Sequence, residues 1–201
     1  MEKPASSDYP ILDVIKRRWS PRAFGERMIE PNKIRQLFEA ARWSASSYNE
    51  QPWRFIVATK DDDKAFKKAL DCLVEANQAW AKQAAMLIFT VTHPTFTRNG
   101  KPNRVHLHDL GLAMANLTLQ ATAMGLFTHQ MAGVDLEKVR KTYGIPEGFE
   151  PHTACAVGYA GDPETLPDPL KKAELEERTR KPLTDLVFAG KWDQAADVVK
   201  P

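Results

Sequence analysis

The segment from Arg104 to Leu126 most constrains how this chain can fold, because it is long, helical in pattern and apolar on nearly every side. Its apolar side chains are Leu107, Leu110, Leu112, Met114, Leu117, Leu119, Ala121 and Met124. A helix with no polar face lies either at the heart of a fold or between two subunits. Gly125 suits the turn that ends such a helix. The segment therefore predicts a long helix, buried inside the fold or at a dimer interface.

A second apolar run, residues 86–91, reads Met-Leu-Ile-Phe-Thr-Val. A run without alternation is typical of a central strand that is buried on both faces. The remaining patterns predict strands over 53–59 and 153–159, a short turn over 127–133, and helices from Pro10 to about Ser20 and over 31–43, 61–73, 78–83, 135–143 and 170–177. Together they predict an α+β fold, with residues 1–201 as a single domain.

Composition excludes several classes of protein. Lys plus Arg total 28 and Asp plus Glu total 26, so the net charge is only +2, which argues against a dedicated nucleic-acid binder. Cys72 and Cys155 lie far apart and form no CxxC pair, as in a reducing compartment. No apolar run approaches the ~20 residues of a membrane span, and no signal-peptide core is present. We therefore expect a soluble, cytoplasmic protein with no membrane partner.

Residues 44–55 form a polar connection between a helix and a strand, reading Ser-Ala-Ser-Ser-Tyr-Asn-Glu-Gln-Pro-Trp-Arg-Phe. Pro52 fixes its own φ and favours an extended Gln51, so the loop is rigid where it enters the strand. Loops held in this way often carry binding groups. An ordinary helix-to-strand connection remains the alternative for this segment.

Basic residues gather at two distant points of the chain. Residues 16–22 read Lys-Arg-Arg-Trp-Ser-Pro-Arg, and Pro21 makes helix continuation past Ser20 unfavourable. A second basic pair, Arg178 and Arg180, comes late in the chain. Arginine forks suit a phosphate dianion, and a serine hydroxyl adds a donor. A solvated basic turn is the simpler alternative for residues 16–22.

Other chemistries find little support. His106 and His108 are two residues apart, so on a helix they point away from each other and cannot share a metal ion. Cys155 sits in an apolar strand pattern that is typical of core. No Walker A loop occurs, and no GxGxxG follows a strand. We therefore expect no metal, no cysteine nucleophile and none of the usual phosphate-cradling loops.

The polar features that remain describe one kind of ligand. The arginines suit a phosphate, and the amides of the 44–55 loop suit the alternating donors and acceptors at the edge of a heterocycle. Flavin mononucleotide (FMN) fits a pocket for a phosphorylated, planar, amide-edged molecule. The residues by themselves leave other nucleotides open.

Five motifs in order along the chain resemble those of the nitroreductase family of FMN-dependent oxidoreductases. They are residues 18–24 (Arg-Trp-Ser-Pro-Arg-Ala-Phe), 46–53 (Ser-Ser-Tyr-Asn-Glu-Gln-Pro-Trp), 109–111 (Asp-Leu-Gly), 125–133 and 178–182 (Arg-Thr-Arg-Lys-Pro). The resemblance covers nearly the whole chain. It implies a mixed central sheet wrapped by helices, in an intertwined homodimer that binds FMN at the subunit interface.

The resemblance also assigns the cofactor-binding residues. Phosphate would be held by Arg18, Ser20, Arg178 and Arg180. Arg22 would lie beside the flavin N1 and C2 carbonyl, where a fixed cation stabilises the negative charge of the reduced ring. The remaining residues would approach the ring or the ribityl chain: Asn49, Gln51, Asn77, Gln130, Met131, Ala132 and Gly133, with a backbone N–H near N5, and, from the other subunit, Ser46, Ser47 and Tyr48.

Two positions depart from the family pattern. Trp19, which the motif also places among the cofactor-binding residues, stands where many members have a second arginine, and Ala132 stands where some have an acidic residue. The implied activity is ping-pong hydride transfer from NADH or NADPH to a small-molecule electron acceptor such as a nitroaromatic, quinone or activated alkene. The flavin N5 would carry the chemistry, so no catalytic side chain is required. A flavin carrier or sensor without turnover, and a metal hydrolase using His106, His108 and Asp109, are the alternatives.

Overall fold

The apolar run at residues 86–92 forms the central strand of a four-stranded sheet. The computed structural model describes residues 2–200, and within them the strands are β1 (Trp53–Thr59), β2 (Met86–Thr92), β3 (Phe127–Met131) and β4 (Glu150–Gly158). Their order is β1-β2-β4-β3. All seven residues of β2 are buried, which confirms the prediction of a strand covered on both faces.

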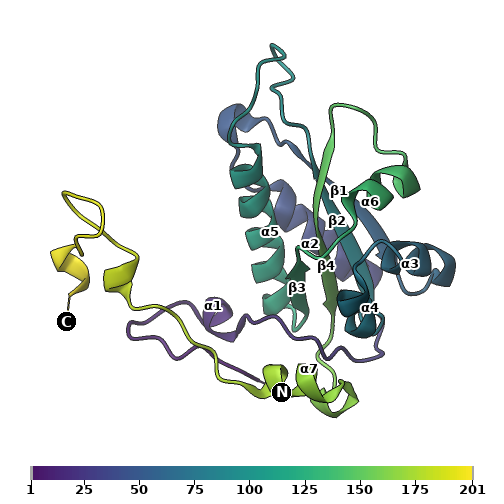
Figure 1. The fold of residues 1–201 in the computed structure, drawn as a ribbon, viewed down its shortest axis with the longest axis horizontal. Helices are drawn as coiled ribbons and strands as arrows, with labels where there is room; N and C mark the ends of the chain where they lie inside the picture. The colour runs from purple at the N-terminus through teal and green to yellow at the C-terminus, as the bar shows by residue number, and fades with distance from the viewer. Residues whose placement is uncertain (1, 201) are drawn as a thin grey trace.

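Helices cover both faces of this sheet (Figure 1). On one face lie α2 (Pro31–Arg42) and α5 (His106–Ala123), which pack with Met86 and Ile88. On the other lie α3 (Asp63–Leu70), α4 (Glu75–Ala81) and α6 (Leu136–Tyr143), which pack with Leu87 and Phe89. Successive side chains of a strand point to opposite faces, so one continuous apolar run supplies both halves of the core. The α+β class is thereby confirmed.

Two details of the predicted sheet are corrected. The family resemblance implied a mixed sheet, but every pairing within residues 2–200 is antiparallel: β1 with β2, β2 with β4, and β4 with β3. Residues 127–131, predicted as part of a turn, form the edge strand β3. Its pairing with β4 along Phe127–Met131 stabilises the extended backbone, although the local sequence contains His129 and Gln130.

The long helix α5 is buried along one side of its surface. Leu110, Ala113 and Leu117 are 6%, 0% and 0% exposed, whereas Leu107 and Leu112 are 52% and 38% exposed. Within one chain, the sheet and α2 therefore cover only part of this apolar helix. Gly125 ends it with a φ of +75°, as expected of a C-terminal glycine. Among the described residues, no helix is both long enough and apolar enough to cross a membrane.

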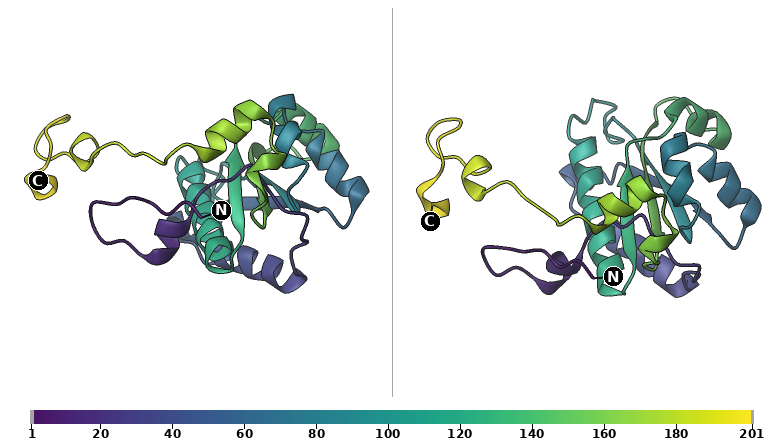
Figure 2. Two further views of the ribbon diagram at one scale, coloured as in Figure 1. Left: turned by 90° about the horizontal axis from the view of Figure 1, so that it is seen from below. Right: turned by 60° about the horizontal axis from the view of Figure 1, so that its bottom comes forward.

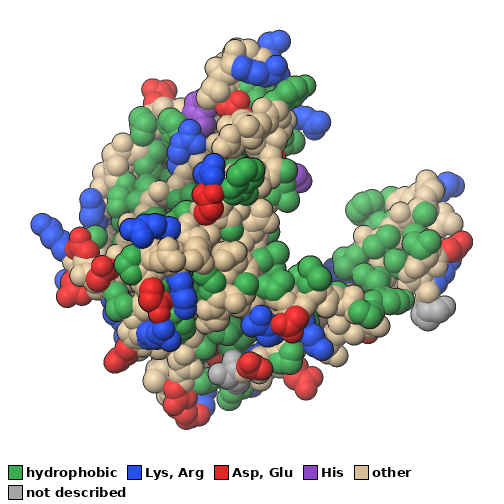
Figure 3. Space-filling model, turned by 180° about the vertical axis from the view of Figure 1, so that it is seen from behind, with side chains coloured by type: hydrophobic (Ala, Val, Ile, Leu, Met, Phe, Trp, Pro, Cys, Tyr) green, Lys and Arg blue, Asp and Glu red, His purple; other side chains and the backbone are tan. Residues whose placement is uncertain are grey.

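The N-terminal segment and the segment after β4 lie on the side of the molecule that carries the C-terminal end of α5 (Figure 1). Near the N-terminus is α1 (Asp13–Arg17), and after β4 comes α7 (Asp168–Leu175). Residues 178–200 then extend away from the body (Figures 1 and 2). The space-filling view shows a hollow between this tail and the body, with apolar side chains on the tail (Figure 3). Leu186 and Trp192 are 56% and 88% exposed there.

Short 3-10 turns complete the chain. They are Ser47–Asn49, Pro163–Thr165, Leu183–Asp185 and Asp197–Val199. Within the tail, Phe188 pairs with Ala195 and its ring lies 5.2 Å from that of Trp192. The tail therefore has its own local structure, although most of its apolar surface is uncovered in a single chain.

Candidate functional site

A basic cavity of about 310 Å³ lies where the N-terminal segment meets the segment after α7. It is lined by Lys3, Arg18, Trp19, Ser20, Arg22, Ala173, Glu174, Glu176, Glu177, Arg178 and Arg180. Both predicted basic clusters are in this set. Arginines about 160 positions apart in sequence thus converge on one space, as the phosphate-binding prediction required.

The wall formed by residues 18–25 is held in place from its far end. Arg18 leaves α1 with an extended backbone, φ −60° and ψ 124°. Phe24 pairs with Ala160, and the N–H of Gly161 donates to the carbonyl of Ala23 at 2.8 Å. A Cβ on Gly161 would lie 2.4 Å from the Phe24 carbonyl carbon, so only glycine allows this approach. The basic turn is therefore anchored to the end of β4.

The arginines of the cavity repel one another. Burial, followed by the charge of Arg180, lowers the pKa of Arg18. Burial, followed by the charges of Arg18 and Arg180, lowers the pKa of Arg178. Arg18 Nη1 donates to Ser20 Oγ at 3.3 Å, which brings a hydroxyl into the same group. Positive charge that is gathered and partly desolvated in this way favours a bound anion, and a phosphate dianion fits the donors present.

A buried carboxylate in this cavity was not found by sequence reasoning. The side chain of Glu174 is 1% exposed and accepts hydrogen bonds from the backbone N–H groups of Arg22 and Ala23. Glu174 lies one helical turn after Leu170, which packs against the core. Residues four apart on a helix share a face, so this spacing could have predicted that Glu174 lies on the inward face of α7. The charged neighbours of Glu174 in sequence pointed instead to a solvated helix.

His129, which precedes the residues predicted to line a planar ring, contacts the basic turn. His129 Nδ1–H donates to the carbonyl of Pro21 at 2.9 Å, which fixes β3 against the turn. The His129 ring lies 4.5 Å from that of Trp80, and burial is the main reason that its pKa is lowered. The charge of Arg22, the residue after Pro21, also lowers this pKa.

Asn77, which the resemblance places near the ring or the ribityl chain, lies against the residues that follow β3. Its Nδ2 donates to the carbonyl of Gly133 at 3.0 Å, and the N–H of Val74 donates to the same carbonyl at 3.2 Å. A Cβ on Gly133 would lie 2.6 Å from Asn77 Nδ2 and 2.7 Å from Val74 Cγ2. These contacts hold Gly133 closely against the start of α4.

Trp19 and Ala132, the two positions that depart from the family pattern, have different surroundings in the structure. Trp19 is 6% exposed, packs edge-on against Phe127 at 5.9 Å between centroids, and lies 5.3 Å beneath the Lys3 ammonium. It borders the cavity but works mainly as core. Ala132 is exposed, and its carbonyl accepts the N–H of Val134 at 2.9 Å.

The amide-rich loop at 46–51 has a strained backbone. Tyr48, Asn49 and Gln51 have φ values of +53°, +55° and +50°, which residues other than glycine seldom adopt. The extended Gln51 expected from Pro52 is therefore wrong. The N–H of Ser47 donates to the buried carboxylate of Asp109 at 3.0 Å. The N–H of Gln51 donates to Ser46 Oγ at 3.0 Å. Strain of this kind persists where the surroundings fix it, and it is common at ligand-binding loops.

One chain does not bring the amide-rich loop and the basic cavity together. The loop binds Asp109 near the start of α5, whereas Arg17 Nη1 donates to the carbonyl of Thr122 near its end, at 3.4 Å. At about 1.5 Å per residue, these points on the helix are ~20 Å apart. The loop instead borders a separate cavity of about 310 Å³ with Val105, His108 and Leu112.

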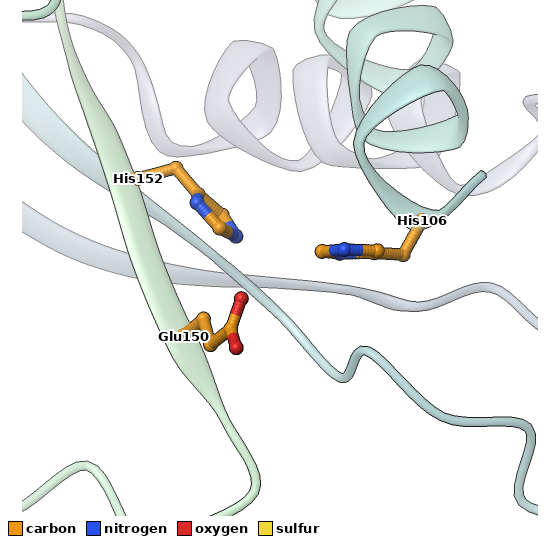
Figure 4. Close-up of side chains that lie close together, drawn as sticks. All are labelled: His106, Glu150 and His152. Carbon is orange, nitrogen blue, oxygen red and sulfur yellow. The ribbon is translucent and has the colours of Figure 1, made fainter. Parts of the chain in front are cut away.

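Three potential metal ligands also come together, in a combination that the sequence did not suggest. His106 projects from α5, and Glu150 and His152 project from β4 toward it (Figure 4). The buried Thr92 hydroxyl lies 2.8 Å from His106 Nδ1 and 2.7 Å from His152 Nε2, so it already pairs with a nitrogen of each ring. This hydroxyl therefore bridges the two histidine rings.

The metal-hydrolase alternative used a different set of residues, and the geometry does not support it. His108 is exposed and lies 3.2 Å from Asp109, while His106 turns toward Thr92. Among residues 2–200, the one cluster with metal-ligand spacing contains neither His108 nor Asp109. Burial also raises the pKa of the Cys155 thiol to about 12, so this cysteine is no nucleophile.

Comparison with known proteins now identifies the family. The model of the nitroreductase family matches residues 15–159, which is more than half of the chain. The chain belongs to the nitroreductase family. This nitroreductase-family chain is also similar to a solved structure described as an oxidoreductase containing FMN, with 34% identity and a TM-score of 0.88. The similarity covers 93% of this chain and 95% of that one.

Two curated relatives extend the comparison. An uncharacterised 15.4 kDa protein of Mycolicibacterium smegmatis is 36% identical over 84 residues, which span 42% of this chain and 56% of that relative. A protein of Archaeoglobus fulgidus, whose name pairs NADH dehydrogenase with NAD(P)H nitroreductase, is 26% identical over 155 residues. That match spans 75% of this chain and 86% of the relative.

Proposed function

We propose that this chain is an FMN-dependent oxidoreductase that transfers hydride from NADH or NADPH to a small-molecule acceptor in a ping-pong cycle. Nitroaromatics, quinones and activated alkenes are the acceptor classes. Support comes from the family membership and from similarity to relatives named for FMN and for NAD(P)H. The observation within this chain that carries the proposal is the convergence of Arg18, Arg178 and Arg180 on one cavity.

In this proposal the basic cavity binds the FMN phosphate. Arg18, Arg178 and Arg180 supply guanidinium donors, and Ser20 supplies a hydroxyl. The mutual repulsion that lowers the pKa of Arg18 and Arg178 is relieved when a dianion enters. Binding a phosphate here therefore uses electrostatic energy that is stored in the free protein.

The ring would lie along the edge formed by residues 130–133. Arg22 follows Pro21, whose carbonyl accepts the His129 N–H, and a fixed cation beside the ring would stabilise the negative charge that collects on the reduced isoalloxazine. Gln130, Met131, Ala132 and Gly133 would line the ring, with a backbone N–H near N5. Asn77 would act through its hydrogen bond to the Gly133 carbonyl, which holds this edge in position.

A second copy of the chain would complete the site. The loop residues Ser46, Ser47, Tyr48, Asn49 and Gln51 lie at the opposite end of α5 from the basic cavity of their own chain. A homodimer that brings this loop to the partner's cavity would supply amides to the heterocycle. The uncovered apolar residues of α5, Leu107 and Leu112, lie on the same end of the helix as the loop and suit such an interface.

When bound, FMN supplies the hydride chemistry itself, so the protein contributes binding, orientation and electrostatics. No acid, base or nucleophile is required of the side chains. The acceptor and the preferred nicotinamide would be selected by residues at the completed dimer interface.

Anaerobic stopped-flow reduction tests the proposal. Protein reconstituted with FMN should be yellow and should bleach with NADH or NADPH, then regain colour on addition of an acceptor from a panel of nitroaromatics, quinones and alkenes. Protein that does not bind FMN would refute it. A flavin carrier or sensor would instead stay yellow with both nicotinamides.

A mixing experiment tests whether the site is shared between copies. The double variant R18M/R180M damages the phosphate wall, and N49A/Q51A damages the amide loop. If the two halves of a site come from different chains, a mixed dimer has one site with both lesions and one with none. Mixing two inactive variants should then restore activity. No restoration is expected if each chain builds its own site.

A further inference from the structure

Glu174 places a buried carboxylate at the wall of a cavity that gathers four arginines and a lysine, with Glu176 and Glu177 also in its lining. Its Oε1 accepts the N–H of Arg22 at 2.9 Å and that of Ala23 at 3.1 Å, and its Oε2 accepts the Arg22 N–H at 3.0 Å. The nearest guanidinium nitrogen, Arg22 Nη1, is 4.0 Å away. Glu174 is therefore held chiefly by backbone donors, and it fixes the basic turn more directly than it neutralises an arginine.

The same residue belongs to the opposite wall of the cavity. Glu174 lies near the end of α7, four residues before Arg178. Lys3 Nζ donates to the carbonyls of Glu174, at 2.6 Å, and of Glu176. Arg178 Nη1 in turn donates to the carbonyl of Lys3 at 2.5 Å. The side chain of Glu174 thus links the turn that carries Ser20 and Arg22 to the segment that carries Arg178 and Arg180.

Electrostatics alone would not favour an acid at this position. A buried negative charge repels a phosphate dianion, and it costs free energy to desolvate. Backbone hydrogen bonds to the carboxylate offset this cost. The hydrogen bonds from the backbone N–H groups of Arg22 and Ala23 fix the position of the turn, so the carboxylate acts on the backbone of the turn.

We propose that Glu174 is a positioning residue for the flavin phosphate. It holds the Ser20–Arg22 turn against the Arg178–Arg180 segment, so that donors from both ends of the chain meet one phosphate group. This inference rests on the proposed function, since it concerns the same site. It assigns a role in cofactor recognition to an acid that does not itself contact the phosphate.

The two possible roles of Glu174 predict opposite changes in FMN affinity when the side chain is replaced. If it acts only through its charge, its removal makes the cavity more positive and tightens FMN binding. If it acts by position, its removal loosens the turn and weakens FMN binding even though the cavity becomes more positive. Riboflavin, which lacks the phosphate, should be affected much less.

Three single substitutions separate these roles. E174Q removes the charge and replaces one acceptor oxygen by a donor that faces the Arg22 N–H. E174D keeps the charge but is about 1.5 Å shorter, so it cannot reach both N–H groups. E177Q removes an exposed carboxylate at the rim of the same cavity and serves as the charge control. The dissociation constants of FMN and riboflavin are measured by the quenching of flavin fluorescence, and folding is checked by near-ultraviolet circular dichroism.

We expect E174Q and E174D each to raise the Kd of FMN about tenfold or more and to change the Kd of riboflavin less than about threefold. We expect E177Q to leave FMN binding unchanged or to make it tighter. A tenfold rise corresponds to about 1.4 kcal/mol. Tighter FMN binding by E174Q, or an equal loss for both flavins, would overturn the inference. Should E174Q not fold, E174D decides the outcome. Wild-type protein that binds neither flavin would remove the proposed function as well.

Discussion

Replacing Arg18 by methionine should have opposite effects on the free protein and on the FMN complex. In the free protein, burial and the charge of Arg180 lower the pKa of Arg18, so its positive charge is held at a cost. Methionine keeps the apolar stem of the side chain and removes the charge. We therefore expect the melting temperature of the protein without flavin to stay unchanged or to rise.

The loss in the complex can be estimated from the donors. A hydrogen bond to a charged group contributes about 1.5–3 kcal/mol. Loss of about 2 kcal/mol from one guanidinium–phosphate contact corresponds to a roughly 30-fold rise in the Kd of FMN. Riboflavin has no phosphate, so its Kd should change little. The ratio of the two dissociation constants isolates the phosphate contribution.

Fluorescence titration of both flavins, together with thermal unfolding of the protein without flavin, measures these effects. The matched control is R27M, because Arg27 pairs with Glu30 at the surface and does not line the basic cavity. It should leave FMN binding within about twofold of wild type, since surface pairs contribute little. Equal weakening of both flavins by R18M, or a lower melting temperature with an unchanged Kd for FMN, would refute the assignment of Arg18 to the phosphate.

Three further predictions concern the supports of the site. G133A should lower the unfolding free energy by about 1–3 kcal/mol and weaken FMN binding, because its Cβ would lie 2.6 Å from Asn77 Nδ2. Urea unfolding measures the first effect, and an unfolding free energy equal to that of the wild type would contradict it. D109A should unfold at lower temperature and free the 46–51 loop to proteolysis, because it removes the acceptor of the Ser47 N–H; an undisturbed cleavage pattern would contradict this. Burial lowers the pKa of His129, so the unfolded state binds more protons and the unfolding free energy should fall as the pH drops below the ordinary value of 6.5 and through the lowered pKa. H129Q should flatten that slope between pH 8 and pH 5, and a parallel slope would contradict the prediction.

Local patterns were sufficient for most helices and strands. The run at residues 86–92, the strand over Trp53–Thr59 and the helix beginning at Pro31 were all found from apolar spacing and proline placement. Strand β3 was missed because Gly125 precedes it, Gly133 follows it, and polar residues interrupt it. Its extended form depends on pairing with β4, which is a long-range contact that no local pattern encodes.

The sequence pointed to the arginines of the cavity but not to its buried acid, for a related reason. Arg18, Ser20, Arg178 and Arg180 were selected by their chemistry and family pattern, and the structure places them around one cavity. Glu174 was missed because its burial depends on packing of α7 against residues 22–23, whereas its sequence neighbours are charged. Residue patterns by themselves leave open which chain supplies the 46–51 loop, because an intrachain and an interchain contact leave the same pattern; only the family resemblance assigned Ser46, Ser47 and Tyr48 to the other subunit.

A homodimer would explain both the position of the 46–51 loop and the exposure of α5. The loop is fixed to the start of α5 through Asp109, where Leu107 and Leu112 leave apolar surface uncovered, while the basic cavity lies by the end of the same helix. A rigid helix keeps these two ends ~20 Å apart in any one chain. If α5 packs against its equivalent in a second copy with the helices antiparallel, the loop of each chain comes to the cavity end of the other. The contact that covers the apolar helix would then be the same contact that completes the flavin site, so cofactor binding and dimerisation would be thermodynamically linked.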